Sequence, residues 1–216
     1  MFDYTLIRSE RKTLGIEIDR SGCLIVRAPQ KMRQAEIERF LQAKELWIKE
    51  KQAAMLTRQK AVISANSDVV WYFGRQFALT HADCKTPVVS DNAIAVPNNW
   101  NENDLVRWYA QELRRDLNER LPYWIAQTGL QPTGCHVTNA RGRWGSCSGK
   151  KSVNFAWRLV FCPPDVIDYV IIHELCHIRH MNHSAAFWSL VAQYDPLYKA
   201  HRLWLREHAA LMDLFI

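Results

Sequence analysis

The chain has 216 residues, of which 48% are hydrophobic and 23% are charged. This composition excludes a disordered protein, and the length excludes a small domain that needs disulfides or a structural metal in order to fold. The formal net charge of +6 favours anionic partners, which include nucleic acids and phosphate-bearing substrates.

The sequence shows no targeting or membrane segment. Its first residues, MFDYTLIRSERK, contain no apolar run of signal-peptide length, and no later stretch approaches the length of a membrane span. The six cysteines are scattered without a CxxC pair, so we expect reduced thiols. Together these features predict a cytoplasmic protein without a membrane partner.

Residues 1–100 are predicted to form a β-rich subdomain with one long helix. The stretches YTLIRS, LGIEID and CLIVRAP have the composition of strands within residues 4–29. Apolar residues then recur at helical spacing among charged ones from about Arg33 to Arg58, which predicts an amphipathic helix. VVWYFGRQFALT is predicted to be a hairpin that turns at Gly74, and VVSDNAIAV a second hairpin.

Residues 101–216 are predicted to form a second domain, which begins with a long helix. This helix covers NENDLVRWYAQELRRDLNERLPYWIAQTGL, where Asn103 or Asp104 is expected to cap the start and Gly129 to end the helix. CHVTNAR and SVNFAWRLVF are then predicted to be strands joined by the basic loop RGRWGSCSGKK. In the second of them, residues 152–161, large apolar side chains alternate strictly, which predicts one buried face.

The next predicted helix carries residues with metal-binding chemistry. Pro163 and Pro164 open it, and the run VIDYVIIHELCHIRH is apolar nearly all round, so we expect it to be buried. His173 and His177 lie four residues apart and point the same way, so they can hold one metal ion between them. Glu174 lies beside the first ligand and can reach a water molecule on that ion. A glutamate in a buried helix would be costly without such a role.

Three side chains compete to be the third ligand. On an unbroken helix His180 would share the face of the first two histidines, but an ion held by those two lies about 7 Å below its Cα at a rise of about 1.5 Å per residue. His183 can reach the ion if the helix ends first and the chain turns back. We therefore favour His183, and His180 and Glu207 remain alternatives.

The residues around His183 are suited to such a turn. Asn182 tolerates a left-handed conformation, and Ser184 can cap a new helix. Three nitrogen ligands leave the fourth tetrahedral position for water, which is typical of catalytic zinc. A closed structural site would need Cys176 as a ligand, but this residue points about 100° away from His177 on the helix.

The stretch RWGSCSGKKSVNFAWRLVFCPPDVIDYVIIHELCHIRHMNHSAAFW closely resembles the signature of the YgjP-like family of zinc metallopeptidases, which is related to the SprT-like and WLM groups. The resemblance is strongest over residues 141–190. It implies zinc on His173, His177 and His183, with Glu174 as catalytic base. It also implies an α+β fold, in which a zincin-like metallopeptidase core over residues 101–216 follows the N-terminal β-rich subdomain.

The favoured function is hydrolysis of a peptide or protein substrate by a zinc-activated water. Strand 152–161 is positioned in sequence to run beside the site and to pair with an extended peptide, although a plain core strand is an equal alternative. An oxyanion stabiliser is also needed. Arg143, Tyr194, His201 and His208 are candidates for this substrate-binding role.

Two other functions remain open. The loop RGRWGSCSGKK is rich in small and basic residues that suit a phosphate, so a metal-dependent hydrolase of nucleoside triphosphates or other phosphoanhydrides is the main alternative. The loop lacks GxxxxGK[ST] and is therefore not a P-loop. The third hypothesis is a nucleic-acid-binding protein stabilised by a metal, which the positive charge favours. No helix-turn-helix or zinc-finger spacing supports it.

Overall fold

The computed structural model describes residues 2–18, 23–53 and 69–215, and it has an α+β fold with several small sheets. The chain divides into two compact units, residues 1–64 and residues 65–216. This division differs from the boundary that we expected near residue 100, because both predicted hairpins pack with the second unit. Within the described ranges, none of the helices is both long and apolar enough to cross a lipid bilayer.

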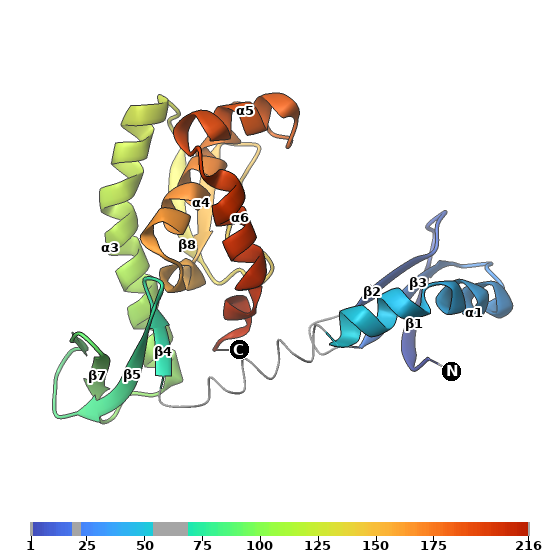
Figure 1. The fold of residues 1–216 in the computed structure, drawn as a ribbon, viewed down its shortest axis with the longest axis horizontal. Coiled ribbons are helices and arrows are strands. Elements are labelled where there is room, and N and C mark those ends of the chain that lie inside the picture. Colours follow the sequence, from blue (N-terminus) through green and yellow to red (C-terminus); the bar gives the residue numbers. More distant parts are fainter. Residues whose placement is uncertain (1, 19–22, 54–68, 216) are drawn as a thin grey trace. The chain divides into compact units, whose positions relative to one another are not determined.

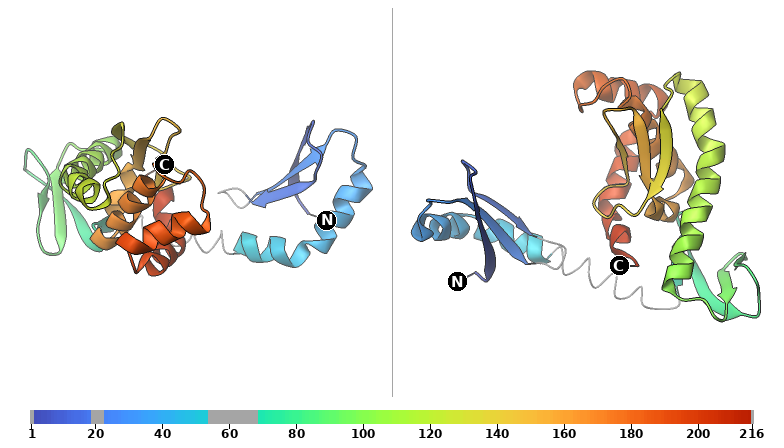
Figure 2. Two further views of the ribbon diagram at one scale, coloured as in Figure 1. Left: turned by 90° about the horizontal axis from the view of Figure 1, so that it is seen from above. Right: turned by 180° about the vertical axis from the view of Figure 1, so that it is seen from behind.

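The first unit is a three-stranded sheet covered by helix (Figures 1 and 2). Its central strand pairs in parallel with β1 and antiparallel with β2. The elements are β1 (Tyr4–Ser9), β2 (Gly15–Ile18), β3 (Leu24–Pro29) and α1 (Gln34–Ala43). The core consists of alternate residues of β3 and of apolar helical residues: Leu24, Val26, Ala28, Ile37, Leu41 and Ile48.

The single long helix predicted from Arg33 to Arg58 is wrong. The helix α1 stops at Ala43, Lys44 forms a turn, and a second helical stretch covers residues 45–53. Ile48 of this second stretch is fully buried in the same core as α1. The helical periodicity continued across the break because both stretches face one sheet. Residues 54–58 lie outside the described part.

Both hairpins predicted between residues 69 and 97 are confirmed. They form a four-stranded sheet in the order β4-β5-β7-β6. The strands are β4 (Val69–Tyr72), β5 (Arg75–Ala82), β6 (Val88–Val89) and β7 (Ala93–Pro97). Phe73 and Gly74 both have positive φ, 43° and 78°, which a two-residue turn between right-twisted strands requires.

This first turn is docked against the segment that precedes the predicted metal helix. The Phe73 N–H donates to the carbonyl of Val160 at 2.8 Å, and the Gly74 N–H donates to that of Phe161 at 3.1 Å. A Cβ on Gly74 would lie 2.8 Å from the Cα of Pro163, which is closer than packed atoms approach. The hairpin therefore supports the start of the helix that follows Pro163.

The rest of the second unit supplies most of the helices. They are α3 (Glu102–Thr128), α4 (Pro164–Cys176), α5 (Ala185–Tyr194), α6 (Tyr198–Glu207) and the 3-10 helices η2 (Trp157–Phe161) and η3 (Ala209–Asp213). Asn101 caps α3, and its side chain accepts from the N–H groups of Asn103 and Asp104, so neither predicted cap is the cap. The predicted end at Gly129 is confirmed, with φ of 67°.

The second unit also contains a small mixed sheet in the order β8-β10-β9. Its strands are β8 (Gly134–Thr138), β9 (Gly145–Cys147) and β10 (Ser152–Ala156), and the central β10 is parallel to β8 and antiparallel to β9. The two predicted strands CHVTNAR and SVNFAWRLVF therefore run parallel, and the loop between them contains the additional strand β9. Because β10 has partners on both sides, it cannot pair with a substrate. Of the two alternatives for strand 152–161, pairing with a peptide is therefore wrong, and its first half is a core strand.

The predicted strand 152–161 is correct only for its first half. Residues 157–161 form η2, and all five are buried. In a strand, the position of Arg158 would face solvent. Instead its guanidinium is fully buried and donates to the carbonyls of Leu214 and Phe215 and to the side chain of Asn139. The strict alternation of apolar residues over 152–161 therefore did not indicate one continuous strand with a buried and an exposed face.

Candidate metal centre

The helix α4 is buried on nearly every side, as predicted. It packs against α3, α5, α6 and β9 (Figure 1). Pro164 occupies its first turn, where a missing N–H is harmless, and Asp165 lies at its positive end. Its last residue is Cys176, and the chain then leaves the helix axis. The helix thus holds the HELCH sequence at its C-terminal end, inside the core of the second unit.

Three imidazoles converge where α4 ends. One ring nitrogen from each of His173, His177 and His183 lies within 4.8 Å of the other two. The Nε2 atoms of His173 and His183 are 3.1 Å apart. We call these three residues the histidine cluster. Neither His180 nor Glu207 joins it, and Glu207 is exposed on α6.

The chain returns to the cluster by a turn that was predicted only in part. Ser184 caps α5 as expected, and its hydroxyl accepts from the N–H of Phe187 at 3.4 Å. Asn182 does not adopt the predicted left-handed conformation. Instead its side-chain oxygen accepts from the Ser184 N–H at 3.3 Å, which closes the turn through a side chain.

Hydrogen bonds orient two of the imidazoles. The Nδ1 of His177 lies 2.9 Å from the carbonyl oxygen of His180, which can only accept. That nitrogen therefore carries the proton, and Nε2 keeps its lone pair. On His173, Nδ1 lies 3.4 Å from the hydroxyl of Tyr169, one turn earlier on α4. Both rings thus direct Nε2 towards the cluster, the arrangement that metal-binding histidines need.

Aromatic side chains surround the cluster. The ring of Phe187 stacks on that of His177, with 4.4 Å between centroids. Trp188 stacks on the exposed ring of His183 at 5.5 Å and 23°. The ring of Tyr198 in turn stacks on that of Trp188, with 5.4 Å between centroids. Stacking on Trp188 therefore helps to orient the ring of His183.

Glu174 is buried beside the cluster with an unsatisfied oxygen. Its side chain is only 5% exposed, and among the described residues Oε2 has no hydrogen-bond partner. Burial raises the pKa of this carboxyl to about 8, and the charge of Arg143 opposes that shift. Its other oxygen lies against Gly145 of β9, where a Cβ would come within 2.7 Å. Only glycine leaves room for the carboxylate there.

These groups fit a divalent cation such as zinc. Burial, followed by the charges of His177 and His183, lowers the pKa of His173 to about 3, and burial also lowers that of His177. Both rings are therefore neutral at physiological pH, as metal coordination requires. Three nitrogen donors would leave one position of a tetrahedral ion for water, which is the donor set of an open zinc site. The unpartnered carboxylate oxygen of Glu174 lies beside these donors.

A pocket of about 250 Å³ adjoins the cluster. Its lining residues come from the loop before β9, from α4 and from α6: Arg143, Trp144, Gly145, Tyr169, Val170, His173, Glu174 and Leu205. Arg143 is thus the predicted substrate-binding residue that lines this pocket. The pocket connects the buried carboxylate to an exposed cation.

The other predicted substrate-binding residues lie elsewhere. Tyr194 is half-buried against the hydrophobic core at the end of α5. His201 hydrogen-bonds Asp195 at 2.8 Å, and its ring centroid is 6.1 Å from that of Tyr169. His208 stacks on Trp204 at 4.0 Å. None of these three side chains lines the pocket beside Glu174.

Three residues of the site were not predicted from the sequence. Tyr169 precedes His173 by four residues, so helical spacing alone gave a signal for their contact. Trp188 follows the cap of α5 by four residues, but nothing in the sequence indicated that it would stack on an imidazole. Gly145 carried no signal, because its role depends on the close approach of Glu174 from another element.

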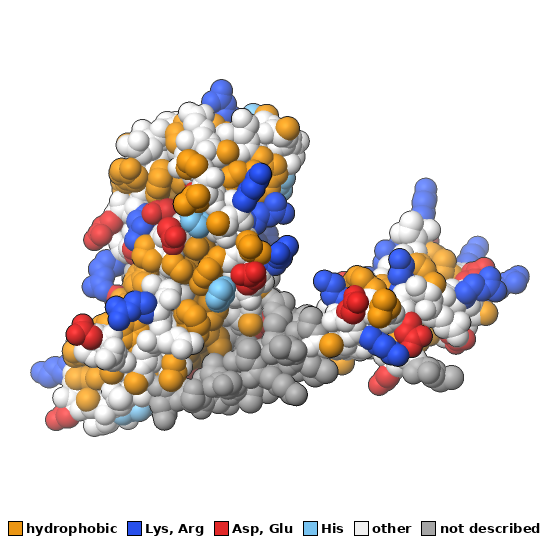
Figure 3. All heavy atoms as spheres, viewed as in Figure 1, with side chains coloured by type: hydrophobic (Ala, Val, Ile, Leu, Met, Phe, Trp, Pro, Cys, Tyr) orange, Lys and Arg blue, Asp and Glu red, His pale blue; other side chains and the backbone are white. Residues whose placement is uncertain are grey.

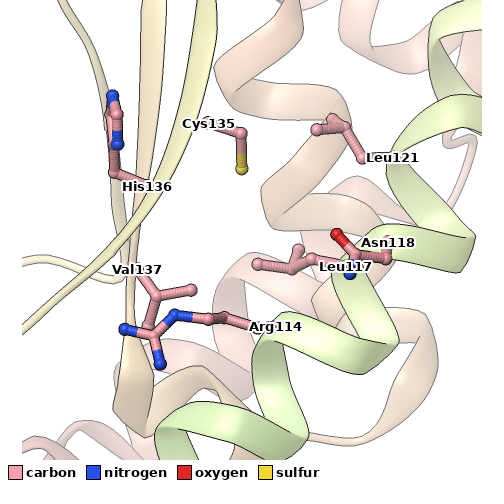
Figure 4. A pocket seen from close by; sticks show the side chains of 7 residues that line it. All are labelled: Arg114, Leu117, Asn118, Leu121, Cys135, His136 and Val137. Atoms are coloured by element: carbon pink, nitrogen blue, oxygen red, sulfur yellow. The ribbon is translucent and has the colours of Figure 1, made fainter.

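A second pocket, of about 310 Å³, lies between α3 and β8. Figure 4 shows Leu117 and Leu121 of α3 on one side and the thiol of Cys135 pointing into the space from the strand. Burial raises the pKa of that thiol, which makes it a weak nucleophile. The pocket lacks the ligand set found at the histidine cluster, so we place the candidate site at the cluster.

Comparison with known proteins shows which sequences the chain is similar to. A family model described as "YgjP-like, metallopeptidase domain" matches residues 12–208. A stretch of 78 residues is 27% identical to a protein of Escherichia coli (strain K12) named "UTP pyrophosphatase". The match covers 34% of this chain and 47% of that protein, which is about half its length. No solved structure matches the chain significantly.

Proposed function

The chain belongs to the YgjP-like family of metallopeptidase domains, and on that premise we propose that it is a zinc-dependent hydrolase. The observation that carries the proposal is the convergence of three imidazoles within 4.8 Å beside a buried carboxylate oxygen that has no hydrogen-bond partner among the described residues. We further propose that the second unit is a zincin-like core, because its HELCH helix lies against a small sheet.

His173, His177 and His183 would hold the metal through ring nitrogens. When bound there, zinc supplies a Lewis acid that polarises the scissile group and lowers the pKa of water towards about 7. Glu174 is the base that accepts a proton from the attacking water, and it then returns that proton to the leaving group. Because Glu174 is only 5% exposed, its carboxyl group is largely shielded from bulk solvent.

We propose a peptide bond as the first candidate substrate, because the matched family is described as a metallopeptidase domain. The free edge of β9 supports this candidate. This strand is at the edge of its sheet, and its Gly145 touches Glu174. An extended peptide added to this edge would run past the carboxylate. The edge strand at the site is thus β9, not the segment 152–161 that we first expected.

Phosphoanhydride hydrolysis is the second candidate. The name of the Escherichia coli relative supports it, and so does the exposed cation Arg143 at the pocket. Purified protein offered casein and, separately, nucleoside triphosphates would distinguish the two candidates. Activity on one substrate that is abolished in Glu174→Gln identifies the reaction. Activity that survives this substitution would contradict the role of Glu174.

Metal analysis tests the proposed ligands directly. We expect wild-type protein to hold one zinc ion per chain and His183→Ala to lose it. His180→Ala is the matched control, because it removes an imidazole outside the cluster but keeps the backbone carbonyl that orients His177. Full metal retention by His183→Ala, or metal loss in the control, would contradict the ligand assignment.

A further inference from the structure

The exposed face of α6 carries a row of cations close to the histidine cluster. Lys199, Arg202 and Arg206 occupy positions i, i+3 and i+7, so they share one face of the helix. Together with Leu203 they line a cavity of about 520 Å³. Figure 3 shows basic side chains gathered along the α6 side of the second unit. We call these three cations the α6 row.

The charges of the α6 row are not neutralised by neighbouring acids in the described ranges. No carboxylate lies within 4.0 Å of any of the three cationic groups. The long helix α3 differs, because Arg107, Arg115 and Arg120 each pair there with an acid on the same helix. The α6 row is therefore a concentrated positive surface, which attracts anions.

Arg202 links this row to the histidine cluster. Its guanidinium lies 4.9 Å from the ring centroid of Trp188, and the same ring stacks on His183. A ligand bound along the row would thus have one part beside the proposed metal site.

The length of the row indicates the chemistry of its ligand. Seven residues of helix span about 10 Å, so the three cations are distributed over that distance. A single carboxylate would engage only one of them. A chain of several phosphates carries charged oxygens along a comparable length, and guanidinium groups bind such oxygens in pairs.

We propose that the α6 row is a subsite for the polyphosphate chain of a substrate whose scissile bond lies at the histidine cluster. This inference rests on the hydrolytic site proposed above, and it concerns the phosphoanhydride candidate. It adds phosphate-binding cations on α6 to those that the loop RGRWGSCSGKK was predicted to supply.

Binding of inorganic tripolyphosphate tests the subsite without turnover. Calorimetric titration would use full-length, zinc-loaded Glu174→Gln protein, with the metal content measured before and after. We expect Arg202→Gln to weaken binding about tenfold, and Lys199→Gln and Arg206→Gln to weaken it about threefold each. Arg202→Lys should recover most of the affinity, because it keeps the charge. Binding to the unsubstituted row should fall steeply with added salt.

Arg107→Gln is the matched control, since it removes one exposed positive charge from α3. An equal loss of affinity in this control would show a general charge effect and would overturn the proposal. Unchanged affinity in all three α6 variants would overturn it as well. So would binding of a tetraglutamate peptide by a protein that does not bind tripolyphosphate.

The binding result is separate from the hydrolytic proposal. If no hydrolysis is found but tripolyphosphate binding depends on the α6 row, the anion subsite is supported and the hydrolase is contradicted. If hydrolysis depends on Glu174 but anion binding does not depend on the α6 row, the hydrolase is supported and the anion subsite is contradicted. Thermal unfolding of each variant would show whether Arg202→Gln acts only through lost packing on Trp188.

Discussion

At the scale of single residues, His183 differs from the other two members of the histidine cluster. It is exposed and lies on the turn between α4 and α5, whereas His173 and His177 belong to the buried end of α4. Their rings are fixed by hydrogen bonds through Nδ1. The ring of His183 stacks on Trp188, so the position of the proposed third ligand depends on aromatic packing as well.

Trp188→Ala is therefore expected to weaken zinc binding by about tenfold or more, which is the usual effect of losing a group that orients a ligand. Trp188→Phe should retain most of the affinity, because a phenyl ring still covers the imidazole. Competition with a zinc chelator would measure both variants. Equal affinity of Trp188→Ala and wild type would show that the ring does not position His183.

Glu174→Gln is expected to stabilise the metal-free protein at neutral and alkaline pH. Burial raises the carboxyl pKa from its ordinary 4.5 to about 8, so between these values the folded state binds more protons than the unfolded state. Wild-type stability therefore falls as pH rises through this range. Because glutamine does not ionise, the variant should gain about 1–3 kcal/mol near pH 8.

This advantage should disappear below about pH 4.5, where the carboxyl is protonated in both states. Thermal unfolding of chelator-treated proteins over the pH range would measure it. Zinc loading should reduce the advantage, since a cation beside the carboxylate offsets the cost of its burial. A difference between the two proteins that does not vary with pH would contradict the assigned cause.

Gly145→Ala is expected to reduce hydrolytic activity about tenfold or more while zinc remains bound. An added Cβ would meet the Glu174 carboxylate at 2.7 Å and move it. Gly149→Ala is a suitable control, because a Cβ there would have no atom within 4 Å. Activity and metal content of the two variants would be compared. Full activity of Gly145→Ala would mean that the carboxylate can shift without consequence.

At the scale of elements, α4 depends on the hairpin that precedes it by almost a hundred residues. Two N–H groups of the β4–β5 turn bind the backbone of η2, directly before the helix begins. At the other side, Arg120 and Trp124 of α3 donate to Asp168 of α4 at 3.0 and 2.8 Å. The metal helix is therefore held by polar contacts as well as by apolar burial.

Gly74→Ala is expected to destabilise the protein by about 2–4 kcal/mol, because it combines a positive φ with an overlap against Pro163. Gly129→Ala is the matched control: its φ is also positive, but a Cβ there would meet nothing within 4 Å. Denaturant unfolding of both variants would separate backbone strain from the overlap. Equal losses would show that the contact with Pro163 contributes nothing.

The elements that were predicted well from the sequence are those whose formation depends on residues within or next to the element itself. Pro164, the apolar run of α4 and the cap at Ser184 are local signals, and the structure agrees with each. The segment 152–161 failed because the burial of Arg158 depends on Asn139 and on the carbonyls of Leu214 and Phe215. Such distant partners leave no periodicity in the sequence.

The same distinction applies to the candidate site. The convergence of His183 with His173 and His177 followed from the end of one helix and the start of the next. Gly145 could not be found in this way, since its contact with Glu174 joins two elements. Sequence alone also could not assign β9 rather than β10 to the edge of the sheet, because strand order is a property of the whole fold.

At the scale of the whole molecule, the histidine cluster, the pocket and the α6 row all belong to the second unit. A fragment that contains residues 65–216 is therefore expected to fold and to bind zinc with the affinity of the full chain. Circular dichroism and chelator competition would check this. A fragment that folds but binds no zinc would show that the first unit contributes to the site.

The bond between His177 and the carbonyl of His180 has a consequence for sequence variation. Every amino acid supplies a main-chain carbonyl, so the tautomer of His177 does not depend on which side chain occupies position 180. That position should accept many replacements in a saturation library, whereas its neighbours in the histidine cluster should accept almost none. A tolerant site this close to the histidine cluster is a convenient anchor for a spectroscopic label.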